Sequence, residues 1–117
     1  MLDEIKKLLP HIEPHTRVTF IINTQTHDKP GQHWDAIYID ARDGPESSNS
    51  IEWFDSFGRP IPAHVLEDCK LILKCLRPNS ILKTKRKPCY QPEGTGYFAC
   101  KFLIDRFRNR PFSAASG

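Results

Sequence analysis

Three short segments of the chain hold side chains that could do chemistry. Residues 31–34 (GQHW) place an imidazole at the start of an apolar run, and residues 54–58 (FDSFG) place a carboxylate at the end of the next one. Residues 91–98 (QPEGTGYF) place an amide and a hydroxyl before a third apolar run. Imidazole titrates near neutral pH, so His33 could accept or donate a proton in a reaction. A strand-edge histidine, an acid in a turn and a glycine-flanked helix start each also have common structural roles. The three segments are therefore informative as an ordered set.

Hydrophobic patterning predicts the strands that would position these segments. Residues 17–23 (RVTFIIN), 33–40 (HWDAIYID) and 51–58 (IEWFDSFG) are rich in β-branched and aromatic residues and are bounded by turn-forming residues. This pattern predicts three successive strands. Residues 80–85 (SILKTK) predict a further strand.

Two longer stretches follow helical spacing. From Pro62 the apolar residues recur every three or four positions until Arg77-Pro78 ends the pattern, which predicts the main helix. A second helix is predicted over residues 97–108, with Cys100 among its core-facing apolar residues. Residues 2–9 predict a short helix that Pro10 stops. The elements together predict an α+β fold with a mixed central sheet.

Length and composition define the broad class of protein. With 117 residues, 38% hydrophobic and 26% charged, the chain has the size and composition of one folded domain. We expect this domain to span residues 1–110 and a flexible tail to follow over 111–117. The first residues carry acids and a proline where a secretory signal would have an unbroken apolar run, and no stretch approaches membrane-spanning length. We therefore expect a cytoplasmic or nuclear protein without a membrane partner.

The cysteines and histidines give no recognisable metal motif. Four cysteines lack the close paired spacing of a zinc site, and five histidines form neither HExxH nor a C2H2 pattern. Buried thiols are the expected state of Cys69 and Cys100. From the sequence we expect no metal and no cofactor.

The ordered segments resemble the adenain type of cysteine protease, the adenovirus protease and its relatives, and more distantly the SUMO-specific proteases of the same clan. Residues 21–40 resemble that family's Asn-Thr turn and His-Trp strand, and residues 52–58 (EWFDSFG) resemble its acid-bearing strand. Residues 91–103 resemble its glutamine loop and nucleophile helix. The resemblance covers roughly residues 17 to 107 and implies a minimal form of this fold, of viral or mobile-element origin.

The resemblance implies roles for four residues. His33 would be the general base, Asp55 would orient its imidazole, and Gln91 would donate a hydrogen bond to the oxyanion. Trp34 would wall the substrate cleft beside the base, although an aromatic side chain on an inner strand is equally typical of a core. A polypeptide is the substrate or partner that these roles imply, in the host cell or the virion.

The nucleophile position departs from the family pattern. Where the family has a cysteine before a Gly-aromatic pair, this chain has Thr95. A threonine hydroxyl has no accessible anion near neutral pH, and threonine nucleophiles rely on their own terminal amine as the base. The loop between Gln91 and Thr95 is also shorter than in the family. We therefore expect a protease-like domain that binds a polypeptide and is catalytically inactive.

Two alternatives remain open from the sequence. One is an active cysteine endopeptidase in which Thr95 replaces the original nucleophile, or in which Cys89 or Cys100 acts instead. The other is a sequence-independent nucleic-acid-binding module, because residues 1–69 hold 6 Lys/Arg against 12 Asp/Glu whereas residues 70–117 hold 11 against 2. The expected phosphate contacts of that module are Lys83, Lys85, Arg86, Lys87, Lys101, Arg106, Arg108 and Arg110.

Overall fold

The computed structural model describes residues 17–23, 33–42, 44–45, 47–76, 79–85 and 94–117. The helix expected over residues 2–9 lies outside these ranges. The strands and helices follow the order β1, β2, β3, α2, β4, α3 and α4. Their bounds are β1 Arg17–Asn23, β2 Trp34–Asp40, β3 Ser50–Phe54, α2 Ala63–Cys75, β4 Ile81–Thr84, α3 Thr95–Phe107 and α4 Phe112–Ala115. Within this part of the chain, no helix is long and apolar enough to cross a membrane.

The four strands form one mixed sheet in their sequence order. Strand β2 pairs antiparallel with both β1 and β3, whereas β4 pairs parallel with β3. The parallel pairing follows from the connection, because helix α2 carries the chain back along the sheet between β3 and β4. The predicted α+β fold with a mixed central sheet is thus confirmed.

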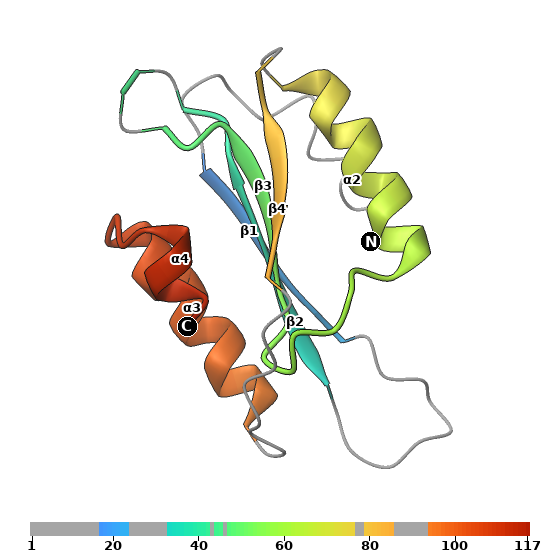
Figure 1. The fold of residues 1–117 in the computed structure, drawn as a ribbon, viewed down its shortest axis with the longest axis vertical. Helices are drawn as coiled ribbons and strands as arrows, with labels where there is room; N and C mark the ends of the chain where they lie inside the picture. The colour runs from blue at the N-terminus through green and yellow to red at the C-terminus, as the bar shows by residue number, and fades with distance from the viewer. Residues whose placement is uncertain (1–16, 24–32, 43, 46, 77–78, 86–93) are drawn as a thin grey trace.

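Helices cover both faces of the sheet. Figure 1 shows the sheet edge-on, with α2 on one side and α3 and α4 together on the other. The alternation of side chains along β2 produces this arrangement, because Ile37 and Ile39 pack in the core under α2 while Ala36 and Tyr38 pack under α3. Strand β2 is therefore apolar on both faces, as an inner strand covered by two helical layers must be.

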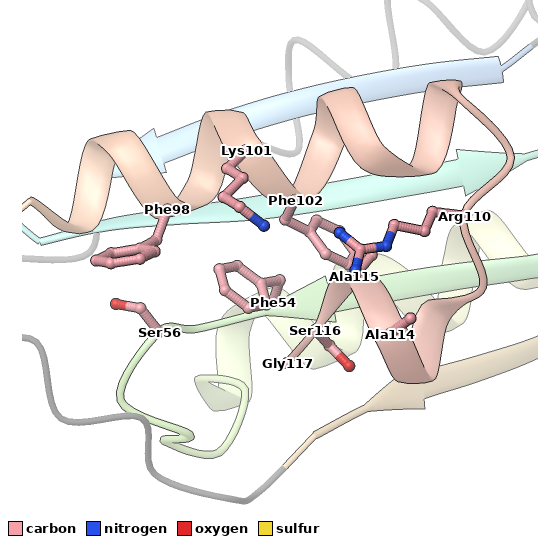
Figure 2. A pocket seen from close by; sticks show the side chains of 10 residues that line it. All are labelled: Phe54, Ser56, Phe98, Lys101, Phe102, Arg110, Ala114, Ala115, Ser116 and Gly117. Carbon is pink, nitrogen blue, oxygen red and sulfur yellow. The ribbon is translucent and has the colours of Figure 1, made fainter.

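Aromatic packing fixes α3 against the end of β3. The ring of Phe54 stacks on that of Phe102 with centroids 4.7 Å apart and planes nearly parallel. Figure 2 shows these rings between Phe98 of α3 and the C-terminal segment, around a cavity of about 150 Å³. Because α3 is held at this end of the sheet, its first turn lies beside the start of β2.

A buried ion pair joins the same two layers. The Nε atom of Arg106 on α3 lies 2.6 Å from Oε1 of Glu52 on β3, and its NH2 group donates to Oε2 of the same carboxylate at 2.8 Å. Arg106 and Glu52 are both buried. The expectation that Arg106 contacts phosphate is therefore wrong, because its guanidinium group is enclosed in the fold and bound to a carboxylate.

The structure also corrects the expectation that Cys100 is a buried residue of α3. Cys100 is exposed, because the buried face of α3 is formed by Thr95, Ala99, Phe102, Leu103 and Arg106. An arginine thus occupies a position that hydrophobic spacing alone would have given to an apolar residue.

The C-terminal residues are part of the packed structure. Instead of a flexible tail, residues 112–115 form α4, and Phe112 and Ala115 join the core under α3. Lys85, just after β4, donates to the Ser116 backbone carbonyl at 2.7 Å. These contacts place the described part of the chain, up to residue 117, in a single packed unit.

Candidate functional site

The candidate site lies at the end of the sheet where β2 begins and β3 ends. Because β2 and β3 are antiparallel, the start of one strand is next to the end of the other. Ala36 pairs with Phe54, and continuing this register by one step places Asp35 opposite Asp55. His33 comes immediately before β2, so its side chain reaches the same corner of the sheet.

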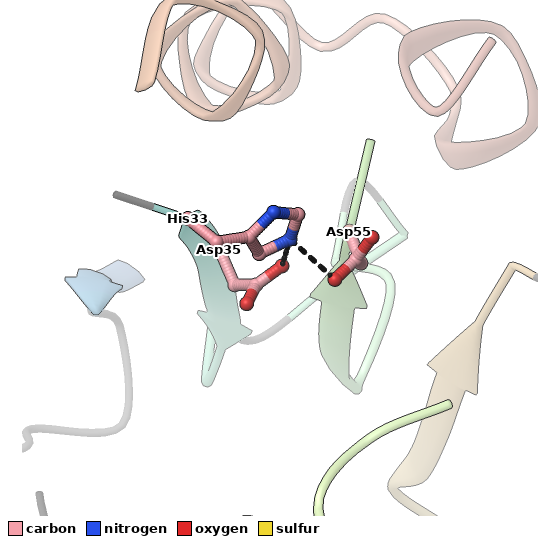
Figure 3. A group of neighbouring side chains, drawn as sticks. All are labelled: His33, Asp35 and Asp55. Carbon is pink, nitrogen blue, oxygen red and sulfur yellow. Dashed lines mark hydrogen bonds and ion pairs between the residues drawn. The ribbon is translucent and has the colours of Figure 1, made fainter. Parts of the chain in front are cut away.

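His33 and Asp55 form the hydrogen bond that their predicted roles require. The His33 Nε2 atom lies 2.8 Å from the Asp55 Oδ2 atom, and both side chains are buried. An ionised carboxylate only accepts hydrogen bonds, so Nε2 carries a proton and Nδ1 is the nitrogen that can accept one. Figure 3 shows Nδ1 on the side of the ring that faces away from the carboxylates.

A second buried carboxyl group, that of Asp35, faces the same imidazole. Its Oδ1 atom lies 3.3 Å from Nε2 of His33, and the residue is 0% exposed. Sequence reasoning missed Asp35, although a signal was present. Residues two apart on a strand point to the same face, so a site built on His33 should include the side chain at position 35.

Hydrogen bonding keeps Asp55 ionised despite its burial. Burial disfavours the charged carboxylate, but hydrogen bonds from the Asp35 carboxyl group, the His33 ring and the Phe57 backbone N–H favour it more strongly. The pKa of Asp55 is consequently below its ordinary value. Asp55 is therefore a stable anion beside the imidazole, which holds the ring in one orientation.

Phe57 and Arg59 enclose the pair from the turn that follows β3. The ring of Phe57 lies 4.8 Å from that of His33, and Arg59 Nε lies 3.3 Å from Oδ2 of Asp55. The Phe57 N–H donates to Oδ1 of Asp55 at 2.7 Å, so this turn folds back on the carboxylate. The FDSFG segment thus supplies both the acid and part of its covering.

Thr95 is the first residue of α3 and lies beside the start of β2. Gly94 precedes it in the left-handed region, with φ of 82°, which favours glycine and turns the chain into the helix. The Trp34 backbone N–H donates to the Thr95 hydroxyl at 3.1 Å. A Cβ atom on Gly96 would lie 3.3 Å from the Trp34 ring, so the glycine allows this close approach. The structure therefore brings together four of the predicted site positions: His33, Trp34, Asp55 and Thr95.

Other predicted site residues either lie outside the described part of the chain or lie away from this cluster. Gln91 and Cys89 lie outside the described residues, as do Arg86 and Lys87. Cys100 is exposed and lies five residues beyond Thr95, which turns it away from the buried face that carries Thr95. The oxyanion role of Gln91 stays a prediction.

The remaining basic residues are spread over β4 and the end of α3. Lys83 is on β4, and Arg108 and Arg110 are exposed after α3. Lys101 and Arg110 each form an ion pair with Asp105, at 3.1 Å and 3.3 Å. Binding of nucleic acid by these residues stays a prediction.

Comparisons with known proteins bear on the fold of the chain. No protein-family model matches the chain. Over 100 residues, 81% of this chain, it is 26% identical to a protein of Acanthamoeba polyphaga mimivirus named "Putative thiol protease R355". The crystal structure of the ASFV pS273R protease, in selenomethionine form, superposes on 90% of this chain with a TM-score of 0.68 and 21% identity. This chain spans only 32% of the mimivirus protein and 39% of the ASFV protease chain.

The chain therefore shares its fold with the ASFV pS273R protease. The sheet and its covering helices correspond to the part of the ASFV protease that this chain matches. Both of these similar proteins are viral and are named as proteases, in agreement with the similarity to viral proteases that the sequence indicates.

Proposed function

We propose that this chain is a polypeptide-binding domain with a cysteine-protease fold that does not hydrolyse the peptide it binds. The observation that carries the proposal is the residue at the start of α3. Thr95 begins α3 and accepts a hydrogen bond from the Trp34 N–H, and the sequence resemblance aligns it with the cysteine of the resembling enzymes. The imidazole and carboxylate of the site are present, but the group that would be activated is an alcohol.

The surroundings of Thr95 do not activate its hydroxyl as a nucleophile, which favours a site that binds a peptide without hydrolysing it. Its hydroxyl oxygen accepts a hydrogen bond from the Trp34 N–H, and the residue is 5% exposed. A secondary alcohol in the middle of a chain has no terminal amine to act as its base. A helix N-terminus lowers the pKa of a thiol enough to give a thiolate, but that of an alcohol is too far above neutral pH for the same effect.

The described cysteines do not provide a substitute nucleophile. Cys100 lies on the exposed face of α3, whereas the site is on its buried face. Cys69 is in the core under α2, and burial together with the neighbouring Asp68 raises the pKa of its thiol to about 11. A peptidase that uses Cys89 is the alternative that the experiment must separate from the proposal.

Hydrolysis is tested with the wild-type chain and a Thr95→Cys variant. We expect no turnover of a fluorogenic Gly-Gly peptide by the wild type, and covalent capture of a Gly-Gly vinyl sulfone probe by Thr95→Cys. A Thr95→Ser variant is the matched control, because it keeps a hydroxyl and removes only a methyl group. Turnover by the wild type that is lost in Cys89→Ala or Cys100→Ala would overturn the proposal.

Binding is tested separately by fluorescence anisotropy of a labelled peptide ending in Gly-Gly. We expect the wild type to bind it and Trp34→Ala to weaken binding at least fivefold, because the Trp34 ring lies against the first turn of α3 and Trp34 follows His33 directly in the chain. Leu71→Ala is the control, since Leu71 is an exposed apolar residue on α2, which covers the opposite face of the sheet from α3. Equal affinity of all three proteins would contradict a binding role for this site.

A further inference from the structure

The corner of the sheet that holds His33 also has the makings of a metal site. The ligand atoms of His33, Asp35 and Asp55 all lie within 4.8 Å of one another, and all three residues are buried. Figure 3 shows the two carboxylates approaching the same ring nitrogen, one from β2 and one from the end of β3. The sequence motifs for zinc missed this group because its members come from two strands.

The distances between these atoms suit one small cation. Nitrogen and oxygen ligands lie about 2.1 Å from Zn²⁺, so two of them at tetrahedral angles are about 3.4 Å apart. The observed separations from His33 Nε2 are 2.8 Å to Asp55 and 3.3 Å to Asp35. An ion would need the Asp55 carboxylate to move outward by about half an ångström, which is within reach of side-chain rotation, whereas Asp35 already lies close to the required spacing.

A cavity gives access to the two carboxylates. It has a volume of about 240 Å³ and is lined by Asp35, Trp53, Asp55, Arg59, Pro60 and Pro62. This volume is enough for several water molecules, one of which would complete a tetrahedral site.

Two residues that line the cavity, Trp53 and Arg59, would affect the binding of an ion there. The indole N–H of Trp53 is buried and has no hydrogen-bond partner among the described residues, so a metal-bound water would supply a missing acceptor. The guanidinium group of Arg59 lies 3.3 Å from Asp55 and competes for its charge, but its side chain is 47% exposed and can turn into solvent.

We propose that His33, Asp35 and Asp55 bind a Zn²⁺ ion, with water from this cavity as the fourth ligand. The proposal goes beyond the peptide-binding function. The metal takes the lone pair of His33 Nε2, so the single proton of the neutral ring moves from Nε2 to Nδ1. A zinc-bound His33 thus has no nitrogen left to accept a proton, so metal binding and a basic His33 exclude each other.

Zinc binding is measured by calorimetry on the full chain carrying Cys75→Ser and Cys100→Ser, which remove the exposed thiols among the described residues. We expect one ion per chain, with affinity at least tenfold lower in Asp35→Asn. Arg59→Met removes the competing cation, so we expect it to bind zinc severalfold more tightly. Asp105→Asn, which removes an acid in a surface ion pair, is the control and should bind as the parent does.

The ring nitrogens of His33 give a second measurement. On addition of ZnCl₂, the ¹⁵N resonance of Nε2 should move to the range of a metal-bound imidazole nitrogen, whereas MgCl₂ should leave it unchanged. No zinc binding, equal affinity in Asp35→Asn and the parent, or binding without a change at His33 would overturn the proposal. Should Asp35→Asn fail to fold, Arg59→Met binding no more tightly than the parent would overturn it. Because neither measurement uses a peptide, the outcome is independent of the peptide-binding function.

Discussion

The Oδ2 atom of Asp55 lies 2.8 Å from Nε2 of His33, and the two residues are 22 positions apart in the sequence. The antiparallel pairing of β2 with β3 produces this contact, because it joins the start of one strand to the end of the other. The contact keeps the proton on Nε2 and turns Nδ1 away from the carboxylates. The fold therefore holds the His33 imidazole in one orientation by means of a buried carboxylate.

The effect of the His33–Asp55 hydrogen bond on reactivity at position 95 can be measured with a thiol in place of the Thr95 hydroxyl. We expect the Thr95→Cys thiol to react rapidly with iodoacetamide at neutral pH, because the helix start and the imidazole stabilise a thiolate. Adding Asp55→Asn should slow alkylation of this thiol at least tenfold, since the imidazole loses the anion that orients it. Mass mapping of the labelled cysteines follows each site separately, and Glu67→Gln is the control for loss of a surface acid. Equal rates with and without Asp55 would show that the contact does not activate the site.

Asp40 should make the stability of the protein depend on pH. Burial raises its pKa, but hydrogen bonds from the Arg42 side chain and from the Ser48 and Arg42 backbone N–H groups lower it well below the ordinary value. The folded-state pKa is thus below the unfolded value, so the stabilisation is complete above about pH 4 to 5 and is lost as the pH falls further. At pH 7 we expect Asp40→Asn to lower the free energy of unfolding by about 2 kcal/mol.

Urea unfolding at several pH values checks this expectation. The gap between the wild type and Asp40→Asn should be widest near neutral pH and should narrow below about pH 4. A gap that stays constant from pH 7 to pH 3 would mean that the ionised carboxylate contributes nothing.

The buried pair of Glu52 and Arg106 should be strongly coupled. Arg106→Met leaves the carboxylate of Glu52 buried without its charge partner, which we expect to cost about 3–5 kcal/mol of stability. The double variant Glu52→Leu/Arg106→Met should lose less than the sum of the single variants, because it buries no unpaired charge. Thermal and urea unfolding of the four proteins gives the coupling energy.

A surface pair provides the comparison for that cycle. Arg110 forms an ion pair with Asp105, and the Arg110 side chain is 53% exposed. Arg110→Met should change the unfolding free energy by no more than about 1 kcal/mol, because solvent screens the pair. Additive effects in the Glu52 and Arg106 cycle would contradict the coupling.

Several features could be predicted from local sequence because local physics determines them. Two-residue alternation and β-branched composition identified the four strands, and the recurrence from Val65 to Leu76 identified α2. The order of the HW, FDSFG and TGYF segments indicated the protease-like fold, which the structural similarity supports. Each of these signals lies within a short window of the chain.

Other features depended on which faces the fold buries. Cys100 was assigned to the core because it continued an apolar stripe, but α3 turns Arg106 inward, where Glu52 compensates its charge, and leaves Cys100 in solvent. Spacing along one helix cannot reveal a charged partner that lies 54 residues away on a strand. For the same reason the tail could not be recognised as a helix, since its packing surface is formed by α3.

The sequence by itself determined the chemical groups of the site: an imidazole, a carboxylate and the hydroxyl of Thr95. It did so because side-chain type and order are written directly in the chain. Only the tertiary structure decided that Asp35 faces the same imidazole nitrogen as Asp55 and that a cavity opens beside both carboxylates. Those facts arise from the register between β2 and β3 and from the turn after β3, and both are fixed by packing between segments that are distant in the sequence.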